Sequence, residues 1–235
     1  MPDRSEIAPP TNPANAAKLE IALALTRLDR KDLSSLEIEE IARKKELLRD
    51  YRVKRALAFH PHVPRTVALR LVRELYTMDL MRLALAPASP ADLRTVAEQA
   101  LIARLSQLAL GEKIALARQA SARVVSALLI EGHRKIVAPA LDNPRLTESQ
   151  ILKVLSKEKI APPVMTAICH HTKWASLATV RMALVRHRQT PLDAAAKFLR
   201  LMTHAELQTI ATLRSISAAL RLQLEGEVER RQRAT

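Results

Sequence analysis

Hydrophobic residues recur at helical spacing along most of the chain, and charged residues separate them. The apolar positions between residues 17 and 28 form a segment of helical length, and Ser34 to Glu37 then has the Ser-x-x-Glu spacing of a helix N-cap. We predict a helical hairpin or cap over residues 17–52. Residues 1–16 are rich in Pro, Ala and Asn without periodicity, and we expect a disordered tail there.

The segment that begins at Val53 recurs at Val180. Over 32 aligned positions without gaps, nine pairs are identical: Val53/Val180, Ala56/Ala183, Leu57/Leu184, His60/His187, Pro64/Pro191, Ala68/Ala195, Arg73/Arg200, Leu80/Leu207 and Ala84/Ala211. A shorter third copy covers residues 139–147 and has Asn143 at the position of the two histidines. These spacings predict a unit of about 42 residues, present about four times over residues 53–235 and ending in a polar C-terminal cap.

Several helix starts in this region carry capping signals. Ser89-Pro90 and Thr190-Pro191 predict a hydroxyl N-cap followed by proline at the first helical position. Two further segments, residues 147–150 and 203–206, have the spacing of a capping box. These signals follow one another closely, so we expect short helices.

The composition favours helices over every other class. Only 2% of the residues are aromatic and only 3 are glycine, which argues against β-sandwiches, barrels and Gly-rich phosphate-binding loops. No apolar run is long enough to span a membrane, and the N-terminal segment lacks the apolar core of a secretory signal. With a single cysteine, Cys169, the cytoplasm is the expected location. We predict an all-α fold, a right-handed α-solenoid of short helical repeats.

Residues 60–64 (HPHVP), 143–147 (NPRLT) and 187–191 (HRQTP) each join two apolar helices. With these turns the chain resembles bacterial α-helical repeat proteins of the HEAT-like and leucine-repeat-variant type, over about residues 53–212. The resemblance implies a binding scaffold, because these families bind varied partners. Some leucine-repeat-variant proteins carry an iron–sulfur module on a cysteine cluster, a feature that does not transfer to a chain whose only cysteine is Cys169.

The chain also resembles certain DNA glycosylases for alkylated bases, which are basic HEAT-like solenoids of about this length. That resemblance would imply binding of damaged duplex DNA on a concave face lined by Trp residues and an Asp. Here Trp174 is the only tryptophan, the nearest acidic residue along the chain is Glu158, and no motif matches residue by residue. A glycosylase is therefore the least favoured alternative.

The net charge of +14 is the strongest functional signal, and it is unevenly distributed. Residues 1–55 contribute +2 and residues 56–235 contribute +12. One stretch, residues 153–200, has nine basic side chains against Glu158 and Asp193: Lys153, Lys157, Lys159, Lys173, Arg181, Arg186, Arg188, Lys197 and Arg200. On one face they would complement a phosphate backbone; otherwise they form an ordinary solvated surface. The scarcity of aromatic residues argues against base stacking.

Two histidine clusters have the residue types of metal sites, the His-x-His at His60 and the Cys-His-His at Cys169. Adjacent helical side chains point about 100° apart, and no second cluster has ligand spacing, so we expect no metal. We expect His60, Asn143 and His187, which share one repeat position, to hydrogen-bond free carbonyls at helix ends. Cys169 is expected to be buried. Trp174 is either a packing residue or an anchor for a partner.

We expect a non-enzymatic binding scaffold whose partner is a protein, with sequence-nonspecific binding of a DNA or RNA backbone as the alternative. The candidate binding residues are Trp174 and the nine basic residues of 153–200. We expect no catalytic residue, no cofactor, no membrane association and no small-molecule substrate.

Overall fold

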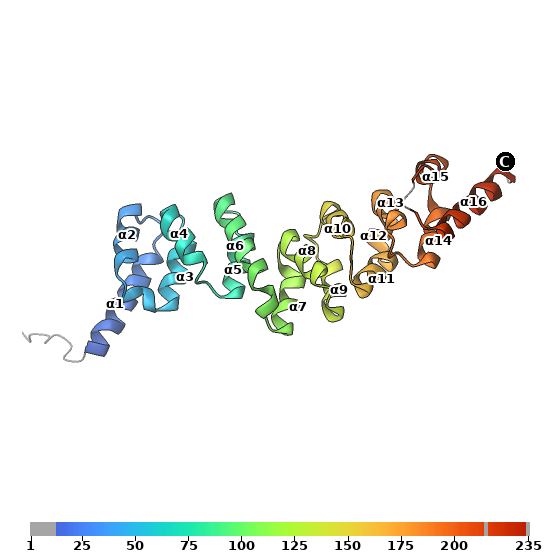
Figure 1. The fold of residues 1–235 in the computed structure, drawn as a ribbon. Helices are drawn as coiled ribbons and strands as arrows, with labels where there is room; N and C mark the ends of the chain where they lie inside the picture. The colour runs from blue at the N-terminus through green and yellow to red at the C-terminus, as the bar shows by residue number, and fades with distance from the viewer. Residues whose placement is uncertain (1–12, 214–215, 234–235) are drawn as a thin grey trace, which may run out of the picture. The chain divides into compact units, whose positions relative to one another are not determined.

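The computed structural model describes residues 13–213 and 216–233, and this part of the chain is helical without a single strand (Figure 1). The chain divides into two compact units, residues 1–103 and residues 104–235. The helices of the first unit are α1 (Pro13–Leu28), α2 (Ser35–Arg43), the 3-10 helix η1 (Leu47–Arg49), α3 (Tyr51–Phe59), α4 (Arg65–Val72), α5 (Thr77–Leu85) and α6 (Ala91–Arg104). The prediction of an all-α fold is therefore confirmed for the described residues.

The second unit consists of short helices as well, most of them of eight to ten residues. They are the 3-10 helix η2 (Leu105–Gln107), α7 (Leu110–Gln119), α8 (Ala122–Glu131), α9 (Arg134–Leu141), α10 (Glu148–Leu155), α11 (Pro162–His170), α12 (Thr172–Ser176), α13 (Ala178–Arg186), α14 (Leu192–Leu201), α15 (His204–Ala211) and α16 (Ala218–Arg233).

Alternate helices pack together in the second unit. Helix α9 lies between α7 and α11, and α10 lies between α8 and α13 (Figure 1). Most of these helices bury an aliphatic stripe, such as Ile151, Val154 and Leu155 of α10. Small side chains, such as Ala194 and Ala195 of α14, let neighbouring helices approach closely. The connections at the ends of alternate helices therefore lie next to one another in this unit.

The first helix begins earlier than the sequence pattern predicts. Helix α1 starts at Pro13, inside the predicted disordered tail of residues 1–16, and residues 1–12 of that tail lie outside the described residues. Both α1 and η1 pack against α3, so residues 17–52 share a core with the start of the predicted repeat region. The composition of residues 1–16 therefore led to a wrong prediction for the first turn of α1, which is helical.

The capping predictions have mixed outcomes. Ser34 and Thr203 both form complete capping boxes, with Glu37 and Glu206 respectively, as predicted. The capping box at Thr147 is wrong, because its hydroxyl pairs with the Ser149 hydroxyl at 3.0 Å. A hydroxyl has several acceptors within reach at a helix start, and the sequence does not say which one it takes.

The predicted positions of two prolines relative to their helix starts are wrong by one residue. Helix α14 begins at Leu192 with Pro191 as its N-cap, and the Thr190 hydroxyl donates to the carbonyl of Leu184 at 2.5 Å. Helix α6 likewise begins at Ala91, after Pro90. Each proline therefore precedes its helix instead of opening it.

A single side chain bridges adjacent loops at the predicted repeat position. His60 Nε2 lies 2.9 Å from the carbonyl of Arg30, and His60 Nδ1 accepts from the amide of His62 at 3.2 Å. His187 does the same with the carbonyl of Lys157 and the amide of Gln189. In the third copy Asn143 donates to the carbonyl of Ala117 at 2.8 Å and accepts from the amide of Arg145 at 2.7 Å. The prediction of carbonyl binding is confirmed at all three.

Replacement of His60 tests this bridge. His60 is 5% exposed, so His60→Ala leaves a carbonyl and an amide without their partner, and we expect a loss of about 1–3 kcal/mol in the free energy of unfolding. His60→Asn should lose much less, because Asn143 makes the same two bonds. Urea denaturation of both variants measures the difference. Equal losses for Ala and Asn would show that the bridge is unimportant.

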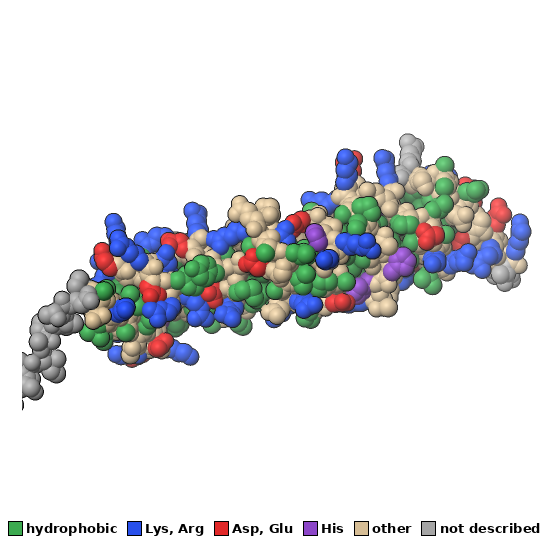
Figure 2. All heavy atoms as spheres, turned by 90° about the horizontal axis from the view of Figure 1, so that it is seen from below, with side chains coloured by type: hydrophobic (Ala, Val, Ile, Leu, Met, Phe, Trp, Pro, Cys, Tyr) green, Lys and Arg blue, Asp and Glu red, His purple; other side chains and the backbone are tan. Residues whose placement is uncertain are grey.

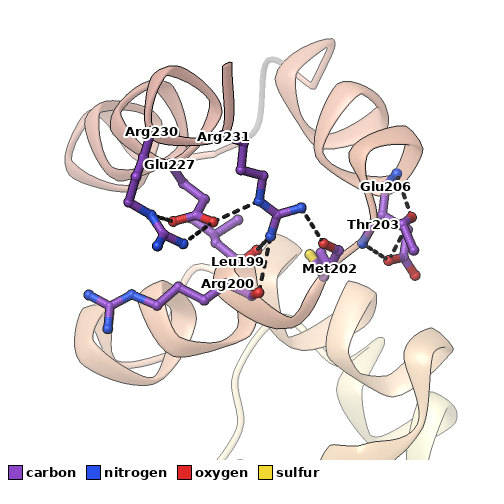
Figure 3. A network of polar contacts seen from close by, with 8 residues as sticks. All are labelled: Leu199, Arg200, Met202, Thr203, Glu206, Glu227, Arg230 and Arg231. Carbon is purple, nitrogen blue, oxygen red and sulfur yellow. Dashed lines mark hydrogen bonds and ion pairs between the residues drawn. The ribbon is translucent and has the colours of Figure 1, made fainter. Parts of the chain in front are cut away.

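The last helix is fixed to α14 by a charged network (Figure 3). Arg231 of α16 donates to the carbonyls of Leu199, Arg200 and Met202 at the C-terminal end of α14. Glu227 accepts from Arg230 and Arg231, and these guanidinium groups lower the pKa of Glu227 to about 2. The carboxylate therefore stays ionised at neutral pH, and it keeps Arg231 in place over the end of α14.

Candidate nucleic-acid interface

Three helix connections of the second unit lie side by side along one edge. They follow α8, α10 and α13, and cover residues 132–133, 156–161 and 187–191. His187 binds the carbonyl of Lys157, and the side chain of Gln189 accepts from the amide of Ile160 at 2.7 Å, so the second and third connections are joined. Gly132 lies so close to Ala161 that a Cβ at position 132 would overlap the Ala161 Cβ. All three connections thus form one continuous strip.

Six cationic side chains lie on or next to these connections, and we call them the basic edge: Arg134, Lys135, Lys157, Lys159, Arg186 and Arg188. All six residues are exposed, and none has an ion-pair partner among the described residues. Two acidic residues lie on or next to these connections: Glu131 forms an ion pair with Lys113, and Glu158 is exposed. The strip therefore carries a strong excess of positive charge.

Four of the predicted binding residues belong to this edge, namely Lys157, Lys159, Arg186 and Arg188. The other cations lie elsewhere: Lys153 is exposed on α10, and Lys197 and Arg200 are exposed on α14. Lys173 lies over the ring of Trp174, 4.1 Å from its centroid, and Arg181 donates to the carbonyl of Ser176 at 2.6 Å. The nine basic side chains of residues 153–200 thus do not all lie on one surface.

Trp174 is part of the core. Its side chain is 1% exposed, and Nε1 donates to the carbonyl of Leu141, at the end of α9, at 2.9 Å. A ring in this position cannot stack on a base or enter a partner's pocket. The prediction that placed Trp174 among the binding residues is therefore wrong, and the packing interpretation is correct.

The sequence pattern did not identify two members of the basic edge, Arg134 and Lys135, as candidate binding residues. They lie outside the stretch 153–200, and the third repeat copy is recognisable only from residue 139 onward. A signal was present, since Gly132 marks the end of one helix and the two cations open the next helix two residues later. That the three connections are neighbours becomes visible only when their helices are packed.

The histidines and the cysteine have structural roles. The rings of His60 and His62 bind the carbonyls of Arg30 and Leu33, and no cluster of three potential metal ligands occurs in the described part of the chain. Cys169 is buried, and burial raises the pKa of its thiol to about 11. A thiol in this state is a poor nucleophile at neutral pH.

The basic edge has the dimensions to contact several phosphates. Packed helices lie about 8–10 Å apart, so three consecutive connections extend over roughly 20 Å. Duplex DNA carries one negative charge per about 1.7 Å of helix axis, so each connection would face phosphates at the same time. Figure 2 shows that Lys and Arg also occur elsewhere on the surface, interspersed with hydrophobic side chains. A test of nucleic-acid binding must therefore distinguish the contribution of the basic edge from that of the overall positive charge.

No family model, curated protein sequence or solved structure matches the chain significantly. Among the described helices, none combines the length and the apolar character needed to cross a membrane.

Proposed function

We propose that this protein is a non-enzymatic, cytoplasmic α-solenoid of HEAT-like repeats that binds the phosphate backbone of nucleic acid through the basic edge. The observation that supports the proposal is the alignment of three helix connections that carry six exposed cations without ion-pair partners. Binding would be insensitive to sequence, because contacts of Lys and Arg with phosphates carry no base information.

A protein partner is the second candidate, and a different surface favours it. Leu19 and Leu23 lie one turn apart on α1 and are 54% and 56% exposed. An apolar pair of this kind fits a protein contact better than a polyanion. It occurs in the first unit, so the two candidates can be tested separately.

Charge reversal on the edge tests the nucleic-acid proposal. The variant Lys157→Glu, Lys159→Glu, Arg186→Glu, Arg188→Glu should lose at least fiftyfold in affinity for random-sequence duplex DNA. In the wild type, raising the salt from about 50 to 200 mM should weaken binding by roughly a thousandfold, as expected for about six phosphate contacts. Fluorescence anisotropy with labelled duplex DNA, single-stranded DNA and RNA measures both effects.

The matched control reverses four exposed cations of the same unit that lie off the edge: Arg118, Arg145, Lys197 and Arg200. It changes the net charge by the same amount and should lose only a few-fold in affinity, through the general field. Equal losses in both variants would assign binding to overall charge. Absence of binding at low salt would exclude the nucleic-acid proposal and leave the protein partner.

A further inference from the structure

The first unit contains a cavity of about 400 Å³ beside the bridge formed by His60. Most of its lining is apolar, with Phe59, Val63 and Leu93 among the larger side chains. Pockets of this volume with an apolar lining and a few polar groups are typical of small-molecule sites. The cavity lies entirely within residues 31–93 and shares no residue with the basic edge.

The polar groups of the cavity leave one positive charge unmatched. Arg65 is neutralised by Asp92, with 2.7 Å between Nε and Oδ2. His60 accepts a hydrogen bond at Nδ1 and faces a carbonyl at Nε2, the pattern of a neutral ring that carries its proton on Nε2. Lys31 lines the cavity and has no ion-pair partner among the described residues. A ligand with a single negative charge would balance it.

The walls of the cavity are held in place before a ligand arrives. His60 ties the connection after α3 to the connection after α1 through the carbonyl of Arg30. Pro61 and Pro90 line the cavity and restrict the backbone on both sides. A preformed site binds more tightly because less conformational entropy is lost on binding.

We propose that this cavity binds a small amphiphilic monocarboxylate, whose aliphatic body contacts Phe59, Val63 and Leu93 and whose carboxylate pairs with Lys31. The volume fits a medium-length aliphatic chain, and the unmatched charge of Lys31 selects a monoanion. This ligand is separate from the nucleic acid of the proposed function and occupies the other unit.

Titration of the full chain with decanoate, followed by isothermal calorimetry and by the methyl NMR signals of Ala86 and Ala88, tests the proposal. Lys31→Glu should weaken decanoate binding at least tenfold, whereas Lys31→Arg should stay within twofold of the wild type. Decanol should bind wild type and Lys31→Glu equally, because it has no charge to pair. Lys45→Glu, an exposed reversal outside the cavity, is the control and should change nothing.

A second variant tests the location independently of charge. Ala88 is exposed at the margin of the cavity, so Ala88→Trp fills the space from outside and should abolish decanoate binding while the helical content stays unchanged. Decanoate binding that survives Ala88→Trp would overturn the location. Lys31→Glu with wild-type affinity would overturn the carboxylate contact, and absence of decanoate binding to the wild type would overturn the proposal as a whole.

Discussion

Trp174→Ala is expected to lower the free energy of unfolding by about 3–5 kcal/mol, the largest effect of any single truncation proposed for this protein. The indole is 1% exposed and is the largest fully buried side chain of the described residues, so its removal leaves a large cavity. The same substitution removes the donor to the carbonyl of Leu141. Urea denaturation followed by circular dichroism measures the loss.

Trp174→Phe separates the two contributions. Phenylalanine keeps most of the apolar volume but has no Nε1 to bond the carbonyl of Leu141, so we expect a smaller loss of about 1–3 kcal/mol. Nucleic-acid affinity should stay unchanged in Trp174→Phe, since a buried ring has no contact with a partner. A folded Trp174→Phe protein with much weaker DNA binding would restore the tryptophan as a binding residue.

Gly132→Ala is the second substitution with a large expected effect, about 2–4 kcal/mol of destabilisation. Gly132 has φ of 79°, in the left-handed region, and ends helix α8. A methyl group at this position would be strained by the backbone and would also overlap the Cβ of Ala161. Both effects act at the point where the first two connections of the basic edge touch.

The loss should extend to function, because the connection after α8 must move away from the connection after α10. Arg134 and Lys135 would move with it, so we expect weaker DNA binding in Gly132→Ala than in the wild type even where the protein is folded. Gly226→Ala is the matched control. Gly226 lies exposed in α16, and a Cβ at this position would meet nothing within 4 Å, so alanine should be neutral or stabilise by up to about 1 kcal/mol. Similar stability for both variants would contradict the close approach at Gly132.

Local patterns determined much of this fold. Hydrophobic residues at helical spacing predicted helices, and the boxes at Ser34 and Thr203 formed because both partners lie within one turn. The repeat alignment also placed His60, Asn143 and His187 at one position, and all three make the predicted contact with a carbonyl. A hydrogen bond from one connection to the carbonyl of a neighbouring connection occurs in each copy of the repeat. Comparison of the copies in the sequence therefore identifies the residue that makes it.

The candidate site, by contrast, was decided by tertiary structure. Proximity in the sequence grouped Lys197 with Lys157, although Lys197 lies within α14 and only Lys157 lies on a connection of the basic edge. Arg134 was missed because its place on the edge comes from the contact between Gly132 and Ala161. The sequence by itself determined which segments are helical and which positions are equivalent, since these depend on neighbours within a few residues. Only the packing of alternate helices decided which charges share a surface and that Trp174 is buried, because both depend on contacts between residues far apart in the chain.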